Sequence, residues 1–384
     1  MINITEKQDC CGCSACAQRC PKQCITMAED VEGFLYPKVD TSNCIDCHLC
    51  EKVCPVINQD EPRTPQNVYA AKNPDETIRM NSSSGGIFTI LAEQVIKSGG
   101  VVFGAYWDDE WDIKHGYAEC IDDLAKFRSS KYLQSVIGDS YLKAEQLLKA
   151  GRKVMFTGTP CQIAGLKHFL RKDYDNLLAV EVICHSVPSP GVWQRYLTEK
   201  IHMLGWKKSD IRHISFRSKA TGWKGYSFMI ENKDGNVFSE LGRKNAFMRG
   251  FLANLYTRPS CQMCPAKQLK SGSDITLGDF WGINSLMPEI DDDKGVSVVI
   301  VNTEKGREAM HIVDNLIPAL WSDICSKNSA VVKSATASEK KDQFFLEDGH
   351  SFENKIHILC KSPFSFRPYT IILLVTFNHS TTTT

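Results

Sequence analysis

Eight cysteines near the start of the chain form two copies of one spacing, and this repeat constrains the fold more than any other feature. Each copy reads C-x2-C-x2-C-x3-C-P, and the eight residues are Cys10, Cys13, Cys16, Cys20, Cys44, Cys47, Cys50 and Cys54. A 4Fe-4S cubane needs four thiolates, and in this spacing three come from one tight loop while the fourth belongs to the other copy. The repeat therefore predicts two 4Fe-4S clusters, with Cys54 completing the first and Cys20 the second.

Two other uses of these cysteines are weighed against the clusters. Four-cysteine zinc sites usually employ two separate C-x(2–4)-C pairs rather than a triple run followed by Cys-Pro. A disulfide framework is disfavoured because a 384-residue chain without a signal peptide is expected to be cytoplasmic, where thiols stay reduced. Cys11 and Cys24 fall outside the pattern and are not expected to be ligands.

The residues between the two copies predict a small sheet. Residues 24–27 and 34–39 have the composition of short strands, and the acidic and glycine residues between them suit a turn. We expect residues 1–58 to form a bacterial-type dicluster ferredoxin domain. Because such a unit has little apolar core, its stability should depend on the clusters.

Charge and hydropathy exclude several classes of partner. The chain has 45 basic and 45 acidic residues and no sustained basic run, so nucleic acid and anionic membranes are poor candidates. The longest apolar run, residues 371–375, is far shorter than the roughly 20 residues that a transmembrane helix needs. We predict no transmembrane segment.

Beyond a linker at residues 59–66, strand and helix patterns alternate. Strands are predicted at 68–71, 100–106, 153–157 and 178–183, and helices at 86–98, 141–149 and 162–170. This alternation predicts a mixed α/β domain over residues 67–360, with functional loops at the strand ends. Residues 361–384 are predicted to be a disordered tail.

Two strand-to-helix junctions have residues suited to chemistry. Residues 82–86, SSSGG, precede a helix, where backbone amides could hold an anion such as a phosphate, although a plain helix cap followed by flexible glycine explains the same residues. Cys161 begins the helix after the strand at 153–157, which would lower its pKa and ready it as a thiolate ligand or nucleophile. The alternative for Cys161 is a small buried hydrophobic residue.

Four cysteines outside the repeat could hold a third cluster. Cys261 and Cys264 are separated by two residues, and the set is completed by Cys161 and Cys184 if the fold brings neighbouring strand ends together. A zinc site at Cys261 and Cys264, or a loop pair without metal, remain alternatives. Residues 273–282 alternate in polarity like a strand that ends in a turn. In that turn, Asp279 could orient a cofactor and Trp281 could cover a flat ring, although a turn-capping aspartate and a core tryptophan explain the same residues.

Taken together, five segments with the double repeat resemble the coenzyme F420 hydrogenase/dehydrogenase beta subunit family. They are residues 83–86 (SSGG), 130–135 (SKYLQS), 158–162 (GTPCQ), 184–189 (CHSVPS) and 274–282 (DITLGDFWG). The resemblance covers about residues 1–305. The resemblance implies a flavin, usually FAD, beside a further 4Fe-4S cluster. It also implies a set of candidate flavin-binding residues, which are Ser83, Ser84, Gly85, Gly86, Lys131, Gln134 and Thr159.

The expected function is an iron-sulfur flavoprotein oxidoreductase of the cytoplasm. It would pass electrons between a two-electron substrate or carrier at the flavin and a one-electron redox partner, such as ferredoxin or another oxidoreductase subunit. The alternatives are an electron-carrier subunit without a flavin and a scaffold that uses its metals only structurally. The substrate, coenzyme F420 included, is not determined by these motifs.

Overall fold

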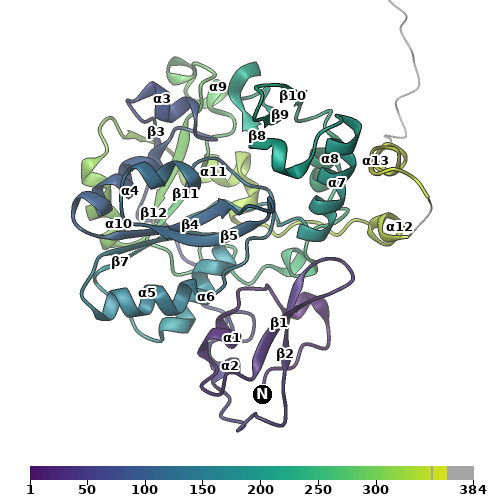
Figure 1. Ribbon diagram of the computed structural model, residues 1–384. Helices are drawn as coiled ribbons and strands as arrows, with labels where there is room; N and C mark the ends of the chain where they lie inside the picture. The colour runs from purple at the N-terminus through teal and green to yellow at the C-terminus, as the bar shows by residue number, and fades with distance from the viewer. Residues whose placement is uncertain (347–348, 361–384) are drawn as a thin grey trace, which may run out of the picture.

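The computed structural model describes residues 1–346 and 349–360, so the predicted tail lies outside the described residues. The chain has the mixed α/β fold that the sequence predicts, with a ferredoxin-like segment at its N-terminus (Figure 1). Within the described ranges, no helix is long and apolar enough to cross a membrane.

The N-terminal segment is built on a two-stranded antiparallel sheet, as predicted. β1 (Ile25–Glu29) pairs with β2 (Leu35–Val39), and helices α1 (Ala15–Arg19) and α2 (Leu49–Lys52) each contain the third cysteine of one quartet. Sulfur dominates the small core of this segment, which consists of Ile2, Cys16, Cys24, Ile25, Cys50 and Cys54. The packing of this segment therefore depends on what its cysteines bind.

The larger part of the chain contains an eight-stranded sheet with the order β13-β3-β12-β11-β7-β6-β4-β5. β4, β6, β7 and β11 run parallel, and the pairs β4–β5, β11–β12, β12–β3 and β3–β13 are antiparallel. The strands are β3 (Asn67–Ala71), β4 (Val101–Trp107), β5 (Ile113–Ala118), β6 (Val154–Gly158), β7 (Leu177–Val182), β11 (Ile275–Asp279), β12 (Ser297–Val301) and β13 (Ile317–Pro318).

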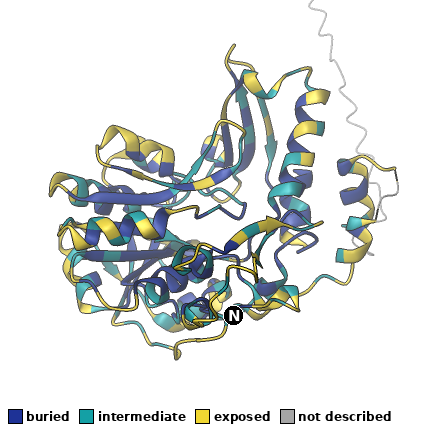
Figure 2. Cartoon of the chain, turned by 60° about the horizontal axis from the view of Figure 1, so that its bottom comes forward, coloured by how far each residue is buried: buried dark blue, intermediate teal, exposed yellow. Residues whose placement is uncertain are grey.

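Helices cover both faces of this sheet, so its central strands are buried (Figure 2). α5 and α6 pack with alternate strand residues such as Phe103 and Phe156, whereas α4 packs on the other face with Val102 and Met155. The helices of this part are α3 (Glu76–Met80), α4 (Ile87–Lys97), α5 (Ser140–Lys149), α6 (Pro160–Leu170), α9 (Ile283–Leu286), α10 (Glu304–Ala309) and α11 (Trp321–Lys327). The predicted strands at 68–71, 100–106, 153–157 and 178–183 and the predicted helices are confirmed within one or two residues at most ends.

A second, three-stranded antiparallel sheet interrupts the alternation, and the sequence patterns did not reveal it. β8 (Ile211–Ser218), β9 (Ser227–Asn232) and β10 (Val237–Leu241) pack against helices around an aromatic core that includes Trp193, Phe216 and Phe247. These helices are α7 (Pro190–Met203), α8 (Ala246–Leu252), α12 (Lys341–Phe345) and α13 (Phe352–Leu359).

Short 3-10 turns complete the described elements. They are η1 (Lys7–Asp9), η2 (Asp122–Phe127), η3 (Lys208–Asp210), η4 (Lys219–Thr221), η5 (Pro259–Met263), η6 (Pro288–Ile290), η7 (Met310–Ile312) and η8 (Ser329–Val331).

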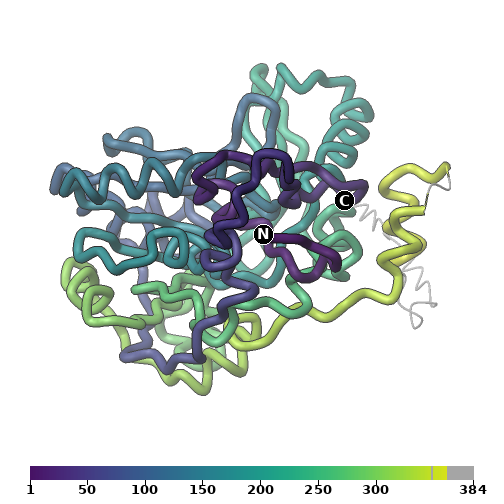
Figure 3. Tube along the Cα trace, turned by 90° about the horizontal axis from the view of Figure 1, so that it is seen from below, coloured from purple at the N-terminus to yellow at the C-terminus, as the bar shows by residue number. Residues whose placement is uncertain are grey.

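The N-terminal segment lies directly against the larger part of the chain (Figure 3). A Cβ atom added at Gly165, in α6, would lie 2.8 Å from the Cβ and 2.9 Å from the Sγ of Cys13, so only glycine permits this approach. At the other side of the contact, Lys341 forms an ion pair of 2.7 Å with Glu32. The segment that connects the two parts is bound to the larger part, since the Arg63 backbone N–H donates to the Gln268 carbonyl at 3.0 Å.

Candidate iron-sulfur centres and cofactor site

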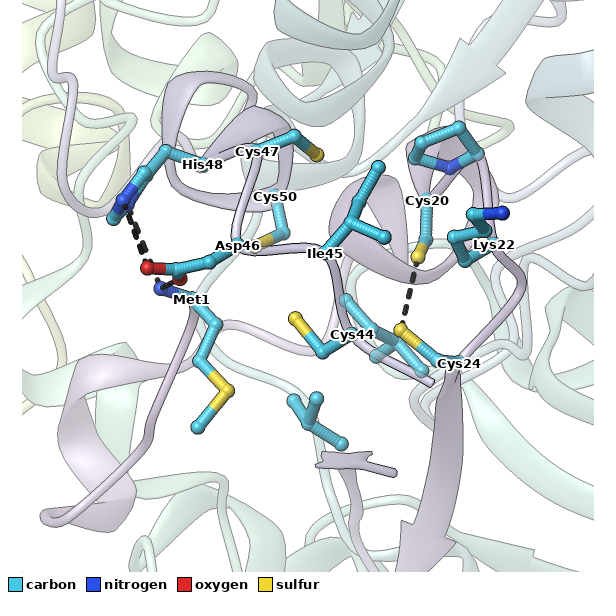
Figure 4. Close-up of a pocket in the computed structure, with 13 residues that line it drawn as sticks. Met1, Cys20, Lys22, Cys24, Cys44, Ile45, Asp46, Cys47, His48 and Cys50 are labelled. Atoms are coloured by element: carbon cyan, nitrogen blue, oxygen red, sulfur yellow. Dashed lines mark hydrogen bonds and ion pairs between the residues drawn. The ribbon is translucent and has the colours of Figure 1, made fainter. Parts of the chain in front are cut away.

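The structure brings the cysteines of the two quartets together in crossed sets. One cavity is lined by a set that we call the Cys10 cage, namely Cys10, Cys13, Cys16 and Cys54. A second cavity is lined by a set that we call the Cys44 cage, namely Cys20, Cys44, Cys47 and Cys50 (Figure 4). Each cavity therefore receives three thiols from one copy and one from the other, which is the donor set that a 4Fe-4S cluster requires.

The two copies wind their backbone in the same way. The residue before the second cysteine has a positive φ in both, 70° at Gly12 and 48° at Asp46. The residue after that cysteine is also left-handed, with φ of 62° at Ser14 and 58° at His48. A chain that turns left-handed on both sides of a cysteine wraps around that cysteine, which gathers the three neighbouring thiols on one side.

Backbone amides point at the sulfurs of both cages. The Ile2 N–H donates to Cys50 Sγ at 3.2 Å, and the Gly12 N–H donates to Cys10 Sγ at 3.4 Å. Hydrogen bonds of this kind stabilise negative charge on cluster thiolates and tune the reduction potential. The thiols and their amides thus fit 4Fe-4S clusters.

The Cys44 cage lies nearer to solvent than the Cys10 cage. Cys47 is exposed, and the neighbouring Ile45 has 58% of its surface exposed, whereas Cys13 and Cys16 are buried. Cys24, which the spacing placed outside the ligand set, also lines the Cys44 cage, and its Sγ lies 3.4 Å from Cys20 Sγ.

The four later cysteines line a third cavity, which we call the Cys161 cage: Cys161, Cys184, Cys261 and Cys264. β6 and β7 are adjacent and parallel, so their carboxyl ends meet at one edge of the sheet. Cys161 follows β6 as the second residue of α6, Cys184 follows β7, and Cys261 lies in η5. The prediction of a third cysteine quartet required that neighbouring strand ends lie together, and β6 and β7 meet this condition.

Two buried cations flank the Cys161 cage, and the sequence reading missed both. Arg258 and Lys267 line the cavity, with 0% and 7% of their surface exposed. Burial raises the pKa of the Cys264 thiol to about 11, and the Lys267 ammonium opposes that rise. Four thiols beside two cations form a cavity suited to a group with net negative charge, such as a thiolate-ligated cluster. In the sequence, Arg258 and Lys267 could have been found from their positions, three residues before Cys261 and three residues after Cys264.

Cys11 connects the Cys10 cage with the Cys161 cage. It is buried and lines both cavities. Its thiol interacts with those of Cys13 and Cys161, which belong to the two different cages, and its pKa is raised first by the contact with Cys13. The two cavities are therefore neighbours separated by one cysteine.

The predicted SSSGG loop lies before α4, but its hydroxyls serve the surrounding framework. Ser83 Oγ accepts from the Ser130 N–H at 2.6 Å, and Ser84 Oγ donates to the Val296 carbonyl at 2.7 Å. The Gly85 N–H donates to Ser297 Oγ at 2.9 Å. Gly86, with φ of 82°, provides no side-chain cap to α4. The first-turn amides of α4 therefore lack the serine cap that a purely structural role would supply.

Lys131 lies beside this loop, because its neighbour Ser130 is bonded to Ser83. Its Nζ donates to the carbonyls of Arg128 and Ser129 at 3.0 and 3.3 Å. Burial lowers the pKa of Lys131 to about 7. The loop thus has next to it a lysine that can gain or lose a proton near neutral pH.

Lys219 also binds this loop, and the sequence reading did not single it out. Its buried ammonium donates to the carbonyls of Ser84, Arg79 and Lys294 at 2.7, 2.8 and 2.6 Å. A lysine that donates three hydrogen bonds to backbone carbonyls holds the loop in one conformation.

Asp279 and Trp281 at the end of β11 are engaged with protein groups. Asp279 accepts from Arg217 Nη1 at 2.8 Å and from Trp223 Nε1 at 2.9 Å. Trp281 stacks on Trp223, with ring centroids 5.2 Å apart and an interplanar angle of 2°. Arg217, which the sequence reading also missed, donates to Tyr132 Oη at 3.1 Å.

The remaining predicted flavin contacts lie at the cages rather than at the loop. Gln134 Nε2 donates to the Cys11 carbonyl at 2.9 Å, and Gln134 Oε1 accepts from Arg258 at 2.8 Å. Thr159 Oγ1 lies 3.3 Å from Cys161 Sγ. Within the described ranges, no hydrogen bond joins Gln134 or Thr159 directly to residues 83–86.

Two segments of the chain match known families. Residues 9–58 match a family described as the 4Fe-4S dicluster domain. Residues 151–317 match the family described as the C terminus of the coenzyme F420 hydrogenase/dehydrogenase beta subunit.

Individual relatives are more distant. The uncharacterized protein MJ1349 of Methanocaldococcus jannaschii is 24% identical over 345 residues, which cover 79% of this chain and 86% of that protein. An uncharacterized protein from the rpl9-rpl11 intergenic region of Porphyra purpurea is 34% identical over 65 residues, covering 15% of this chain and 84% of that protein. Among solved structures, a chain of the F420-reducing [NiFe] hydrogenase complex from Methanosarcina barkeri matches with a TM-score of 0.44 and 19% identity, over 78% of this chain and 91% of that chain.

Proposed function

Because the chain belongs to the coenzyme F420 hydrogenase/dehydrogenase beta subunit family, with a 4Fe-4S dicluster domain at its N-terminus, we propose that it is an iron-sulfur flavoprotein oxidoreductase. It exchanges electron pairs with a small-molecule substrate or carrier at FAD. It exchanges single electrons with a redox partner, such as ferredoxin or another oxidoreductase subunit, through two N-terminal clusters and a third cluster in the Cys161 cage.

One observation supports this proposal most strongly: the Cys10 and Cys161 cages are neighbours, with Cys11 lining both. The Cys44 cage is the most exposed of the three, since it contains the exposed Cys47. The cages therefore form a series that begins at the surface and ends at the carboxyl edge of the large sheet. Ligands of α/β sheets bind at that edge.

The residues around the α4 loop have separate tasks in this function. The first-turn amides of α4 and the loop of Ser83, Ser84, Gly85 and Gly86 bind the phosphates of the cofactor. Lys131 places a cation where charge develops on reduction and can hold a proton near neutral pH. When bound, a flavin transfers two electrons to or from substrate and one at a time to iron-sulfur centres.

The proposal assigns each part of the chain a role. Residues 1–58 are the dicluster ferredoxin domain, residues 59–66 the linker, and residues 67–360 the flavin and iron-sulfur domain. Gln134 and Thr159 support the border between the cofactor and the Cys161 cage. The abundance of free thiols suits a reducing cytoplasm.

An anaerobic preparation tests the proposal by its content of iron, sulfide, zinc and flavin. We expect about twelve irons and one flavin per chain. A preparation of about eight irons with one zinc and no flavin would overturn the assignments of the third cluster and the flavin.

A second candidate function is an electron-carrier subunit without a flavin. It is favoured by the hydrogen bonds that commit Ser84 to the carbonyls of Gly278 in β11 and of Val296, and Gly85 to Ser297 in β12. This candidate predicts eight or twelve irons and no flavin, together with full reduction by a one-electron donor.

A further inference from the structure

Arg258 is a buried cation without a carboxylate partner in the described part of the chain. Its side chain has 0% of its surface exposed. Its guanidinium donates to the carbonyls of Cys10 and Leu35 at 2.7 and 3.0 Å and to Gln134 Oε1 at 2.8 Å. It also lies over the ring of Tyr36, 4.3 Å from the centroid. All of these partners are neutral, although buried charges normally have an opposite charge nearby.

Two acidic residues near Tyr36, on whose ring the guanidinium lies, are already paired with lysines. Asp30 forms an ion pair of 2.6 Å with Lys7, and Glu32 forms one of 2.7 Å with Lys341. The guanidinium also contacts a sulfur, since Arg258 Nη2 lies 3.5 Å from Cys10 Sγ. We therefore look for the negative charge that balances Arg258 in the groups bound by the neighbouring cysteine cages.

The Cys10 loop is shaped to receive this cation. A Cβ added at Gly12 would lie 2.7 Å from Arg258 Nη1 and 2.9 Å from its Cζ. The guanidinium thus packs on the backbone between Cys10 and Cys13, and it also lines the Cys161 cage on its other side. A thiolate-ligated cluster has a net negative charge that increases by one on reduction, so an adjacent cation favours the reduced form.

We propose that Arg258 is a positioning residue whose charge partners are the clusters of the Cys10 and Cys161 cages, between which it lies, and that it raises the reduction potential of both above that of the Cys44 cage. An electron entering at the exposed Cys44 cage would then be drawn inward, toward the Cys161 cage. This inference rests on the proposed iron-sulfur function and adds a direction to it.

The test is a redox titration of the whole anaerobic protein, followed by electron paramagnetic resonance. Cys16→Ser and Cys47→Ser, which alter one cage each, assign the signals. Arg258→Gln removes the cation, and Arg258→Lys keeps it. The matched control is Arg19→Gln, because Arg19 lies at the same contact between the two parts but is paired with Glu145 at 3.1 Å.

We expect Arg258→Gln to lower the equilibrium constant for reducing the Cys10 cluster about tenfold, which is about 59 mV for a one-electron couple. Arg258→Lys should lower it less, and Arg19→Gln should leave it unchanged. An unchanged Cys10 potential in Arg258→Gln, or an equal shift at both N-terminal clusters, would overturn the inference.

Two other outcomes of this experiment are also informative. Arg258→Gln could be isolated without clusters. In that case Gln134→Glu is used instead, because it places a carboxylate next to the guanidinium and should lower the reduction potential of the Cys10 cluster. An unchanged potential in Gln134→Glu would count against the inference. If the wild-type protein itself shows no cluster signals, the proposed iron-sulfur function fails rather than the role of Arg258.

Discussion

The contact between α6 and the Cys10 loop can be tested by adding a single methyl group. Gly165→Ala would place its Cβ 2.8 Å from Cys13 Cβ, 2.9 Å from Cys13 Sγ and 3.1 Å from Tyr141 Oη. Carbon atoms pack best at about 3.5–4.0 Å, so the N-terminal segment must retreat from α6 by roughly 1 Å. The substitution therefore acts mainly on the docking of the two parts of the chain, with a smaller clash against Tyr141 in the interior of the larger part.

Two opposing effects set the size of the change. Replacing a helical glycine by alanine stabilises a helix by about 0.5–1 kcal/mol. Overpacking a close contact costs about 1–3 kcal/mol. We expect a net loss of about 1 kcal/mol in the free energy of unfolding. The matched control is Gly191→Ala in α7, which faces the same segment but whose Cβ would meet Gly33 Cα at 3.1 Å, so its loss should be smaller or absent.

Anaerobic urea denaturation with two probes measures this difference. All seven tryptophans follow residue 66, so their fluorescence reports on the larger part, whereas iron-sulfur absorption reports on the cages. In Gly165→Ala the absorption transition should move to lower urea and separate from the fluorescence transition. Equal midpoints in wild type, Gly165→Ala and Gly191→Ala would show that the segment does not pack on α6 as described.

Three more outcomes are expected. Removing iron with a chelator should abolish hydrogen-exchange protection in β1 and β2 while β6 and β7 stay protected, because cysteines dominate the N-terminal core. Cys184→Ser should lower the iron content by about four per chain and leave the signals of the two N-terminal clusters intact. Since burial lowers the pKa of Lys131 to about 7, its ammonium is present below that pH and lost above it, so flavin affinity should weaken as pH rises through 7. Burial also lowers the pKa of Lys219, which binds the Ser84 carbonyl, to about 7, so Lys131→Met should reduce that dependence rather than abolish it. A fluorescence titration with FAD measures this, and an unchanged dependence would exclude Lys131 as a source.

Local patterns were sufficient for much of the fold. The strands and helices of the eight-stranded sheet follow from runs such as residues 153–157 and from helix starts such as Pro160, because periodicity and capping act over neighbouring residues. The three-stranded sheet of β8, β9 and β10 was missed because its strands mix buried and exposed residues irregularly, and β8 contains register shifts against β9.

The residues around the cages were only partly predictable. Spacing predicts the cysteines as candidate ligands, since the ligands of one cluster must be near each other in the chain or at adjacent strand ends. Lys219 and Arg217 could not be singled out, because each binds a partner that is distant in sequence, Ser84 and Asp279. Arg258 lies three residues before Cys261, but its contact with Cys10 could not be predicted for the same reason. Gln134 and Thr159 were recognised from their motifs, but only the structure places them beside Arg258 and Cys161.

The position of Arg258 joins the packing of the chain to its electron path. It is the residue directly before η5, and its carbonyl accepts from the Cys261 N–H at 3.0 Å. Its side chain meanwhile binds the Cys10 loop, so one residue connects a proposed ligand of the first cage with a proposed ligand of the third. We therefore expect a change in charge at the Cys10 cage to act on the turn that holds Cys261. The contact of Arg258 with the Cys10 loop thus holds the N-terminal segment in place and also connects the Cys10 cage with the Cys161 cage. Weakening this contact should disturb both cages.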